Sequence, residues 1–186
     1  MFEQDYLNHV SLPAKLCDEI ERNVARLFLI SNVNRYPVDP MQIAHERGYD
    51  LVPFTQMPKE VKSELIFKDI DGISHYDPER NKFVVYYRRS GTEERLRFTI
   101  GHEIGHIRMN HRHESELARR IADYYSAYML APTPWIGHAG CKDYTDVAKT
   151  FFLSDPCAKI CFERYKRRSK LPYTKKHEET LLWLLS

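Results

Sequence analysis

Several features of membrane and exported proteins are absent from this sequence. No apolar run approaches the roughly 20 residues that a membrane-spanning helix needs. The first six residues contain neither a basic stretch nor an apolar one, so they are unlike a secretory signal peptide. We therefore expect a cytoplasmic protein that has no membrane partner.

An excess of charge of one sign is absent as well. The chain has 28 lysines and arginines against 26 aspartates and glutamates, which gives a formal net charge of +2 at pH 7. This balance excludes the strongly basic character that is typical of proteins that bind phosphate backbones. The most basic stretch, 159–170, is typical of a solvated helix face. Direct nucleic-acid binding through it is the weaker alternative and is not expected.

Cysteines with the spacing of a metal site are also lacking. The four cysteines include no Cys-x-x-Cys pair. Cys157 and Cys161 are four residues apart on an expected helix, where disulfide geometry is poor. For a cytoplasmic chain, these observations indicate reduced and mostly buried thiols. A second metal site at these cysteines is not expected.

The apolar residues that are present predict an α+β fold. Hydrophobic residues make up 42% of the 186, which suits one domain or one domain with a small appendage. Apolar periodicity and capping signals predict helices over 3–31, 41–47, 92–110, 115–131, 145–152 and 154–171. Strands of a small mixed or antiparallel sheet are predicted over 49–54, 64–67, 73–76 and 83–87. Residues 135–144 are expected to form a connector.

One motif carries chemistry, the His-Glu-x-x-His pattern at 102–106. On a helix, His102 and His106 lie one turn apart on one face, a spacing that suits two ligands of a zinc ion. Glu103 is then the general base, which takes a proton from the zinc-bound water. The alternative is a chance match on an ordinary helix. Gly101 and Gly105 count against chance, because each costs about 1 kcal/mol inside a helix. Close approach of another backbone or a ligand would compensate.

The third zinc ligand must come from elsewhere, since a catalytic zinc usually has three protein ligands and one open position. The acids in and before the next helix are Glu114, Glu116 and Asp123. Glu116 and Asp123 are seven residues apart and share a helix face. Glu116 is the predicted ligand, and Asp123 is the alternative. His111 and His113 are expected in a solvated connection between the two helices.

Two blocks resemble the ImmA/IrrE family of metallopeptidases. The first is 97–106, which contains the motif, and the second is 122–132, which reads Ala-Asp-Tyr-Tyr-Ser-Ala-Tyr-Met-Leu-Ala-Pro. Weaker similarity at 36–40, 71–74 and 151–164 occurs in the same order. The resemblance therefore covers roughly residues 20 to 168 and rests on several blocks rather than one.

The resemblance implies a zincin-like, more narrowly gluzincin-like, peptidase core. A small sheet, the His-Glu-x-x-His helix and a partner helix would form a domain over 1–140, followed by a helical extension over 141–186. The tail, 175–186, is expected to dock as a terminal helix or to contact a partner. The implied function is zinc-dependent cleavage of a helix-turn-helix repressor or antitoxin-like protein, as occurs in bacteria, mobile elements and phage.

One position departs from the family pattern. The family's metal-binding glutamate falls four residues before the position matched to Asp123, and Arg119 occupies it here. A cation beside zinc is unfavourable in a low-dielectric site. Glu116 would serve as ligand instead, or Asp123 would be recruited from a role in orienting a histidine. The alternative function is a catalytically silent peptidase-fold protein that binds the same kind of partner.

Overall fold

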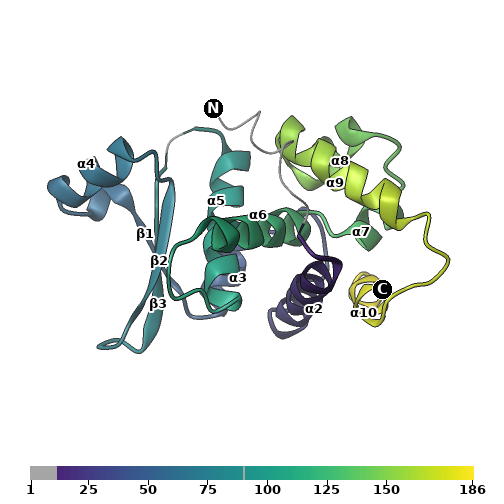
Figure 1. Ribbon diagram of the computed structural model, residues 1–186, viewed down its shortest axis with the longest axis horizontal. Coiled ribbons are helices and arrows are strands. Elements are labelled where there is room, and N and C mark those ends of the chain that lie inside the picture. The colour runs from purple at the N-terminus through teal and green to yellow at the C-terminus, as the bar shows by residue number, and fades with distance from the viewer. Residues whose placement is uncertain (1–11, 90) are drawn as a thin grey trace. The chain divides into compact units, whose positions relative to one another are not determined.

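The computed structural model describes residues 12–89 and 91–186 and has the predicted α+β fold (Figure 1). Contacts divide the chain into two compact units, one of residues 39–126 and one that joins the chain up to residue 38 with residues 127–186. The predicted boundary at residue 140 separates a peptidase domain from an extension, and it stays a prediction. The long helix α6 begins in the first of these units and ends in the second.

A three-stranded mixed sheet lies in the 39–126 unit. Its strands are β1 (Asp50–Pro53), β2 (Gly72–Asp77) and β3 (Lys82–Tyr87), in the order β1-β3-β2. Strand β3 pairs in parallel with β1 and antiparallel with β2. Three of the four predicted strands are therefore confirmed. The order leaves β1 and β2 as the two edge strands of the sheet.

The predicted strand at 64–67 is wrong, because these residues end helix α4 (Lys59–Phe67). A run of four apolar and polar residues does not distinguish a strand from a helix segment by periodicity alone. An ion pair four residues apart, with Lys68 Nζ 2.6 Å from Glu64 Oε1, supports the helical form. Only Leu65 of α4 is buried, and Phe67 is 90% exposed.

Three further helices begin in this unit, and each follows a residue whose side chain caps it. They are α3 (Pro40–Glu46), α5 (Glu93–Arg108) and α6 (Glu116–Leu130). The side chains of Asp39, Thr92 and Ser115 accept hydrogen bonds from backbone N–H groups in the first turns. Helix α5 contacts β2, β3 and α3, as the ribbon shows (Figure 1). The helix that carries the motif is thus supported by the sheet.

The other unit is helical. It contains α2 (Ala14–Ile30), α7 (Thr133–His138), α8 (Tyr144–Phe151), α9 (Asp155–Arg168) and α10 (Lys176–Trp183). The predicted helices are confirmed, although residues 3–11 of the first lie outside the described residues. The predicted connector at 135–144 is wrong in its first part, since α7 begins at Thr133 with Pro134 in its first turn, where proline is tolerated.

The C-terminal tail docks as a helix, which confirms one of its two expected states. The indole Nε1 of Trp135 donates a hydrogen bond to the carbonyl oxygen of Leu181 at 2.7 Å, and both residues are fully buried. Three of the four cysteines are buried thiols. Across residues 12–89 and 91–186, every helix is too short or too polar to cross a membrane.

Candidate metal centre

Helices α5 and α6 touch at Gly105, one residue before the second motif histidine. A Cβ atom built on Gly105 would lie 3.0 Å from Cβ of Tyr125 and 3.1 Å from Cα of Ala122. A side chain here would force α6 to shift by a few tenths of an ångström, because real Cβ atoms rarely approach other atoms so closely. The close approach expected to compensate for a glycine inside the helix is therefore present at Gly105.

The two motif histidines point at one another across one turn of α5. Their Nε2 atoms are 3.0 Å apart, and their ring centroids are 4.7 Å apart. On the other side of His102, Nδ1 lies 2.8 Å from Oδ1 of Asp123 on α6. A carboxylate only accepts, so Nδ1 of His102 donates and its Nε2 lone pair is left for a metal.

His106 is held in a similar way by a residue that we expected elsewhere. Nδ1 of His111 lies 3.0 Å from Nδ1 of His106. The prediction of a solvated connection is wrong for His111, which is half-buried, whereas His113 is exposed. When His106 binds a metal through Nε2, its Nδ1 carries the proton and donates to His111.

The fold of the chain after α5 explains the position of His111. Asn110 adopts the left-handed conformation with φ +55°, and the backbone N–H of His111 donates to the carbonyl of His106 at 3.0 Å. This six-to-one hydrogen bond is typical of a Schellman helix end, in which Asn is one of the residues that tolerate the left-handed position. The Asn after the helix was the sequence signal that could have placed His111 beside the motif.

The side chain of Glu103 lies beside the site and is 5% exposed. Burial raises the pKa of its carboxyl group, and this effect outweighs the opposing effects of His102 and of a hydrogen bond from Ser74. The hydroxyl of Ser74 donates to Oε2 of Glu103 at 2.7 Å. A carboxyl group whose pKa is moved toward neutrality suits a general base.

The two motif histidines differ in their pKa values. Burial lowers the pKa of His102, but the hydrogen bond and the charge of Asp123, followed by the charges of Glu103 and Glu114, raise it overall. Burial, followed by the charge of His102, lowers the pKa of His106 to about 4. The pair therefore holds a first positive charge readily on His102 and a second one poorly, because a second imidazolium would be buried beside a like charge.

The acids predicted as third ligands take different positions. Asp123 faces His102 Nδ1, which is the contact of an orienting acid. Glu116 is exposed in the first turn of α6. Glu114 forms an ion pair with Arg119, and its charge adds to the raised pKa of His102 and opposes the lowering of the pKa values of His106 and His111 by burial. Glu114 therefore stays among the candidate acids, and its carboxylate is paired with Arg119.

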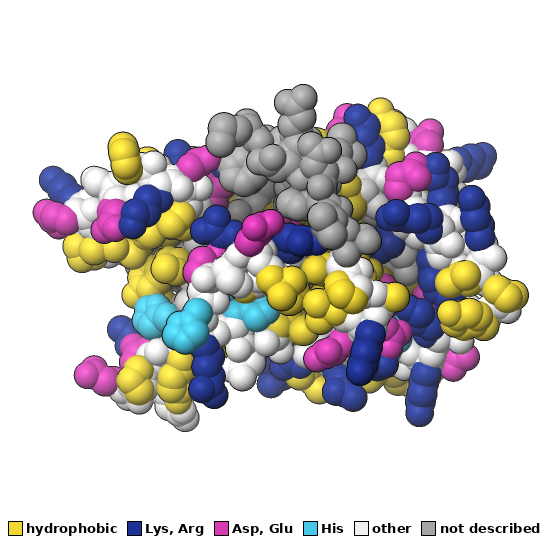
Figure 2. Space-filling view, in the orientation of Figure 1, with side chains coloured by type: hydrophobic (Ala, Val, Ile, Leu, Met, Phe, Trp, Pro, Cys, Tyr) yellow, Lys and Arg dark blue, Asp and Glu magenta, His cyan; other side chains and the backbone are white. Residues whose placement is uncertain are grey.

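The two imidazole donors suit zinc as a pair, and the described residues bring no third ligand atom within 4.8 Å of both. Two imidazole nitrogens 3.0 Å apart can both lie at the Zn–N distance of about 2.0–2.1 Å from one ion, and each ring is oriented by a partner on its other nitrogen. The side chain of His102 is 20% exposed, so the site is reachable from solvent. Histidine side chains are visible at the surface in the space-filling view (Figure 2).

Tyr124, Tyr125 and His75 carry groups that can donate a hydrogen bond to a developing oxyanion. The hydroxyl of Tyr125 is fully buried, and burial raises its pKa. His75 is exposed and stacks on Tyr86 with a centroid distance of 5.6 Å. Tyr124 is half-buried. The site has no assigned oxyanion donor among these three residues.

A second group of potential metal ligands lies in the helical unit. Asp18, Glu21 and His177 bring three ligand atoms within 4.8 Å of one another. The ammonium group of Lys175 already lies 3.0 Å from Glu21 Oε2 and 3.3 Å from Asp18 Oδ1. Since the ammonium group of Lys175 already neutralises these carboxylates, the cluster forms ion pairs between α10 and α2.

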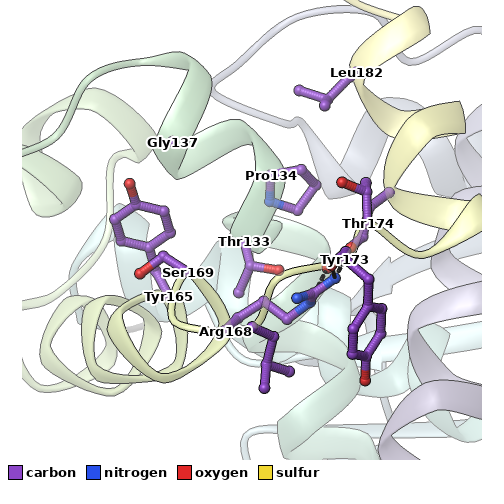
Figure 3. Close-up of a pocket in the computed structure, with 11 residues that line it drawn as sticks. Thr133, Pro134, Gly137, Tyr165, Arg168, Ser169, Tyr173, Thr174 and Leu182 are labelled. Atoms are coloured by element: carbon purple, nitrogen blue, oxygen red, sulfur yellow. Dashed lines mark hydrogen bonds and ion pairs between the residues drawn. The ribbon is translucent and has the colours of Figure 1, made fainter.

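The helical unit also contains a shallow pocket of about 200 Å³ (Figure 3). Arg168 projects into it, but its guanidinium donates to Glu178 Oε1 at 2.6 Å and to the carbonyl of Tyr173 at 2.7 Å. A second cation of the basic stretch, Lys166, forms an ion pair with Glu163. These pairings fit a solvated helix face rather than a surface reserved for phosphates.

Residues 78–169 match the model of peptidase family M48. The matched segment contains the His-Glu-x-x-His helix and the whole of α6. The match supports a metallopeptidase family and protease activity in general, and peptidases of family M48 depend on a metal, typically zinc. The fold described above is consistent with a zincin-like peptidase domain. No curated protein matches the chain.

Proposed function

We propose that this protein is a zinc-dependent endopeptidase. The observation that carries the proposal is the pair of Nε2 atoms 3.0 Å apart, with Asp123 and His111 on the opposite ring nitrogens. His102 and His106 would hold the ion. When bound, zinc polarises the scissile carbonyl and lowers the pKa of a water molecule.

The chain's own residues then account for the proton movements of hydrolysis. Glu103 accepts a proton from the attacking water, whose oxygen forms the new bond to the carbonyl carbon. The same carboxyl group donates that proton to the nitrogen as the C–N bond breaks. Burial raises the pKa of Glu103, which makes the carboxylate a better base for taking the proton from water.

The substrate proposed for this activity is a helix-turn-helix regulator or antitoxin-like protein in the cytoplasm. This part rests on the resemblance of residues 97–106 and 122–132 to the ImmA/IrrE family. The test is incubation of the zinc-loaded protein with a purified regulator encoded beside its gene. Site-specific fragments would support the assignment, whereas an intact regulator beside an efficiently cleaved unfolded protein would contradict it.

A second candidate function has a specific observation in its favour. Arg119 occupies the position of the family glutamate and pairs with the exposed Glu114, so this position supplies a cation where the family has a metal ligand. A chain without a third ligand would bind its partner through the peptidase fold without cleaving it. The two functions differ in zinc affinity, which a substitution at Arg119 can test.

Arg119→Glu is expected to tighten zinc binding by about tenfold. The substitution releases Glu114 and adds a second acid on the helix that faces the site. Single substitutions around metal ligands commonly change metal affinity by about 10–100-fold. Competition with a chromogenic chelator measures the affinity. Arg119→Ala is the matched control, because it releases Glu114 without adding an acid. Zinc binding by Arg119→Glu alone, with none by the unmodified chain, would favour the silent protein.

The same assay distinguishes the candidates for the third ligand. Glu116→Gln is expected to weaken zinc binding more than Glu114→Gln if the predicted ligand is correct, and the reverse order would assign Glu114. Asp123→Asn is expected to lower affinity by about 10–100-fold without abolishing binding, as for other residues that orient a ligand. Complete loss of zinc in Asp123→Asn would instead make Asp123 a ligand.

A further inference from the structure

We propose that Ser74, on the edge strand β2, is a positioning residue that holds the carboxylate of Glu103 for proton transfer. The inference deepens the proposed peptidase function and rests on it. Ser74 lies 29 residues before Glu103 in the chain and on a different element, so the contact exists only in the folded protein.

The contact joins one strand residue to one carboxylate by a side-chain hydrogen bond. The Ser74 hydroxyl donates to Oε2 of Glu103 at 2.7 Å. A hydrogen bond of this length to an ionised acceptor belongs to the stronger class. Because Glu103 is 5% exposed, solvent cannot easily replace this donor.

The other carboxylate oxygen is confined by the neighbouring glycine. A Cβ atom built on Gly72 would lie 2.9 Å from Oε1 of Glu103, 3.0 Å from its Cγ and 2.8 Å from Cγ2 of Thr99. The absence of a side chain at Gly72 therefore allows β2 to lie directly against α5 at Glu103. Together, Gly72 and Ser74 restrict the carboxylate on two sides.

Pairing of β2 with β3 fixes the position of Ser74 relative to Glu103. Ser74 pairs with Val85 in the antiparallel ladder of β2 and β3, and Val85 is fully buried. Sites built on paired strands hold geometry more closely than sites on loops. A base displaced by about 1 Å can lose about 100-fold in rate, so a donor that fixes Glu103 has a direct effect on the chemical step.

The test compares Ser74→Ala with Ser74→Thr and with Ser126→Ala. Thr restores a hydroxyl and suits a strand. Ser126 is the matched control, because its hydroxyl is also buried and donates to the carbonyl of Phe98 at 2.8 Å, on the same pair of helices that carries the motif. Initial rates are measured with zinc-loaded full-length protein on fluorescently labelled unfolded casein, together with bound zinc per chain.

We expect Ser74→Ala to lower kcat by about 10- to 100-fold with KM and bound zinc unchanged. Ser74→Thr should recover most of the rate, and Ser126→Ala should lower Tm without a specific loss of kcat. An unchanged kcat in Ser74→Ala would overturn the proposal. So would an equal loss of kcat in Ser126→Ala, because that result would indicate a general effect of a lost buried hydroxyl.

A second measurement separates this inference from the proposed function. In a double-mutant cycle, the Tm shifts of Ser74→Ala and Glu103→Ala should be clearly non-additive, since each substitution removes the hydrogen bond and residues in direct contact couple. Additive shifts would show that Ser74 does not hold Glu103. If the zinc-loaded unmodified protein cleaves neither casein nor a regulator, the proposed function fails, and a positioning role for Ser74 in catalysis is overturned with it. The cycle then reports only the contact.

Discussion

Glu103→Gln is expected to lower the rate of peptide hydrolysis by about 10²–10⁴-fold while leaving zinc bound. Glutamine keeps the size of the side chain and can still accept a hydrogen bond from Ser74, but it cannot take a proton from water. The buried position of Glu103 makes replacement of the base by a solvent molecule inefficient. Initial rates on labelled unfolded casein, with elemental analysis of the same samples, measure both properties.

Glu93→Gln is the matched control for this experiment. Glu93 lies on the same helix, α5, but is exposed in its first turn, so its substitution should leave both rate and zinc content unchanged. A Glu103→Gln protein that retains the full rate would contradict the assignment of Glu103 as the base. Loss of zinc in Glu103→Gln would instead indicate that the residue supports the metal site.

Gly105→Leu is expected to destabilise the protein and weaken zinc binding together. A Cβ atom at this position would already lie 3.1 Å from the backbone of Ala122, and the remaining atoms of leucine would force α5 and α6 apart. Overpacking of this kind costs about 3 kcal/mol, which corresponds to a fall in Tm of about 6–12 °C in a chain of this size. Separation of the helices would also break the contact of His102 with Asp123.

Gly137→Ala provides the comparison. It is also a helical glycine, but the nearest atom to its built Cβ is a ring carbon of Tyr165 at 3.2 Å, and a side-chain ring can move where a backbone cannot. Its Tm should change by no more than about 4 °C, because alanine gains helix propensity of about 1 kcal/mol. Thermal unfolding and zinc titration of both variants test the difference. Equal effects of the two substitutions would refute a special contact at Gly105.

The parts of the fold set by local rules were predictable from the sequence. Asp39, Thr92 and Ser115 cap the helices that follow them because side-chain oxygens satisfy the first backbone N–H groups. The strands with dense β-branched and aromatic residues were also correct. The strand expected at 64–67 failed because a short apolar run has no period of its own, and α4 extends through it.

The site was predictable only in part, because some of its contacts depend on long-range pairing and not on local sequence. The spacing of His102 and His106 follows from helix geometry, and the roles proposed for both rest on it. The contact of Ser74 with Glu103 depends on which strand becomes the edge of the sheet, and no local pattern specifies that pairing. The position of His111 depends on a single left-handed residue, Asn110, at the end of α5.

The central claim is that His102 and His106 hold a zinc ion. Elemental analysis of protein purified without metal-affinity steps tests it most directly, beside His106→Ala and His177→Ala. We predict close to one zinc ion per chain in the unmodified protein and in His177→Ala, because Lys175 already occupies the acidic cluster around His177. His106→Ala should contain almost none. Absence of zinc from the unmodified protein after incubation with a modest excess, or its loss in His177→Ala alone, would contradict this account.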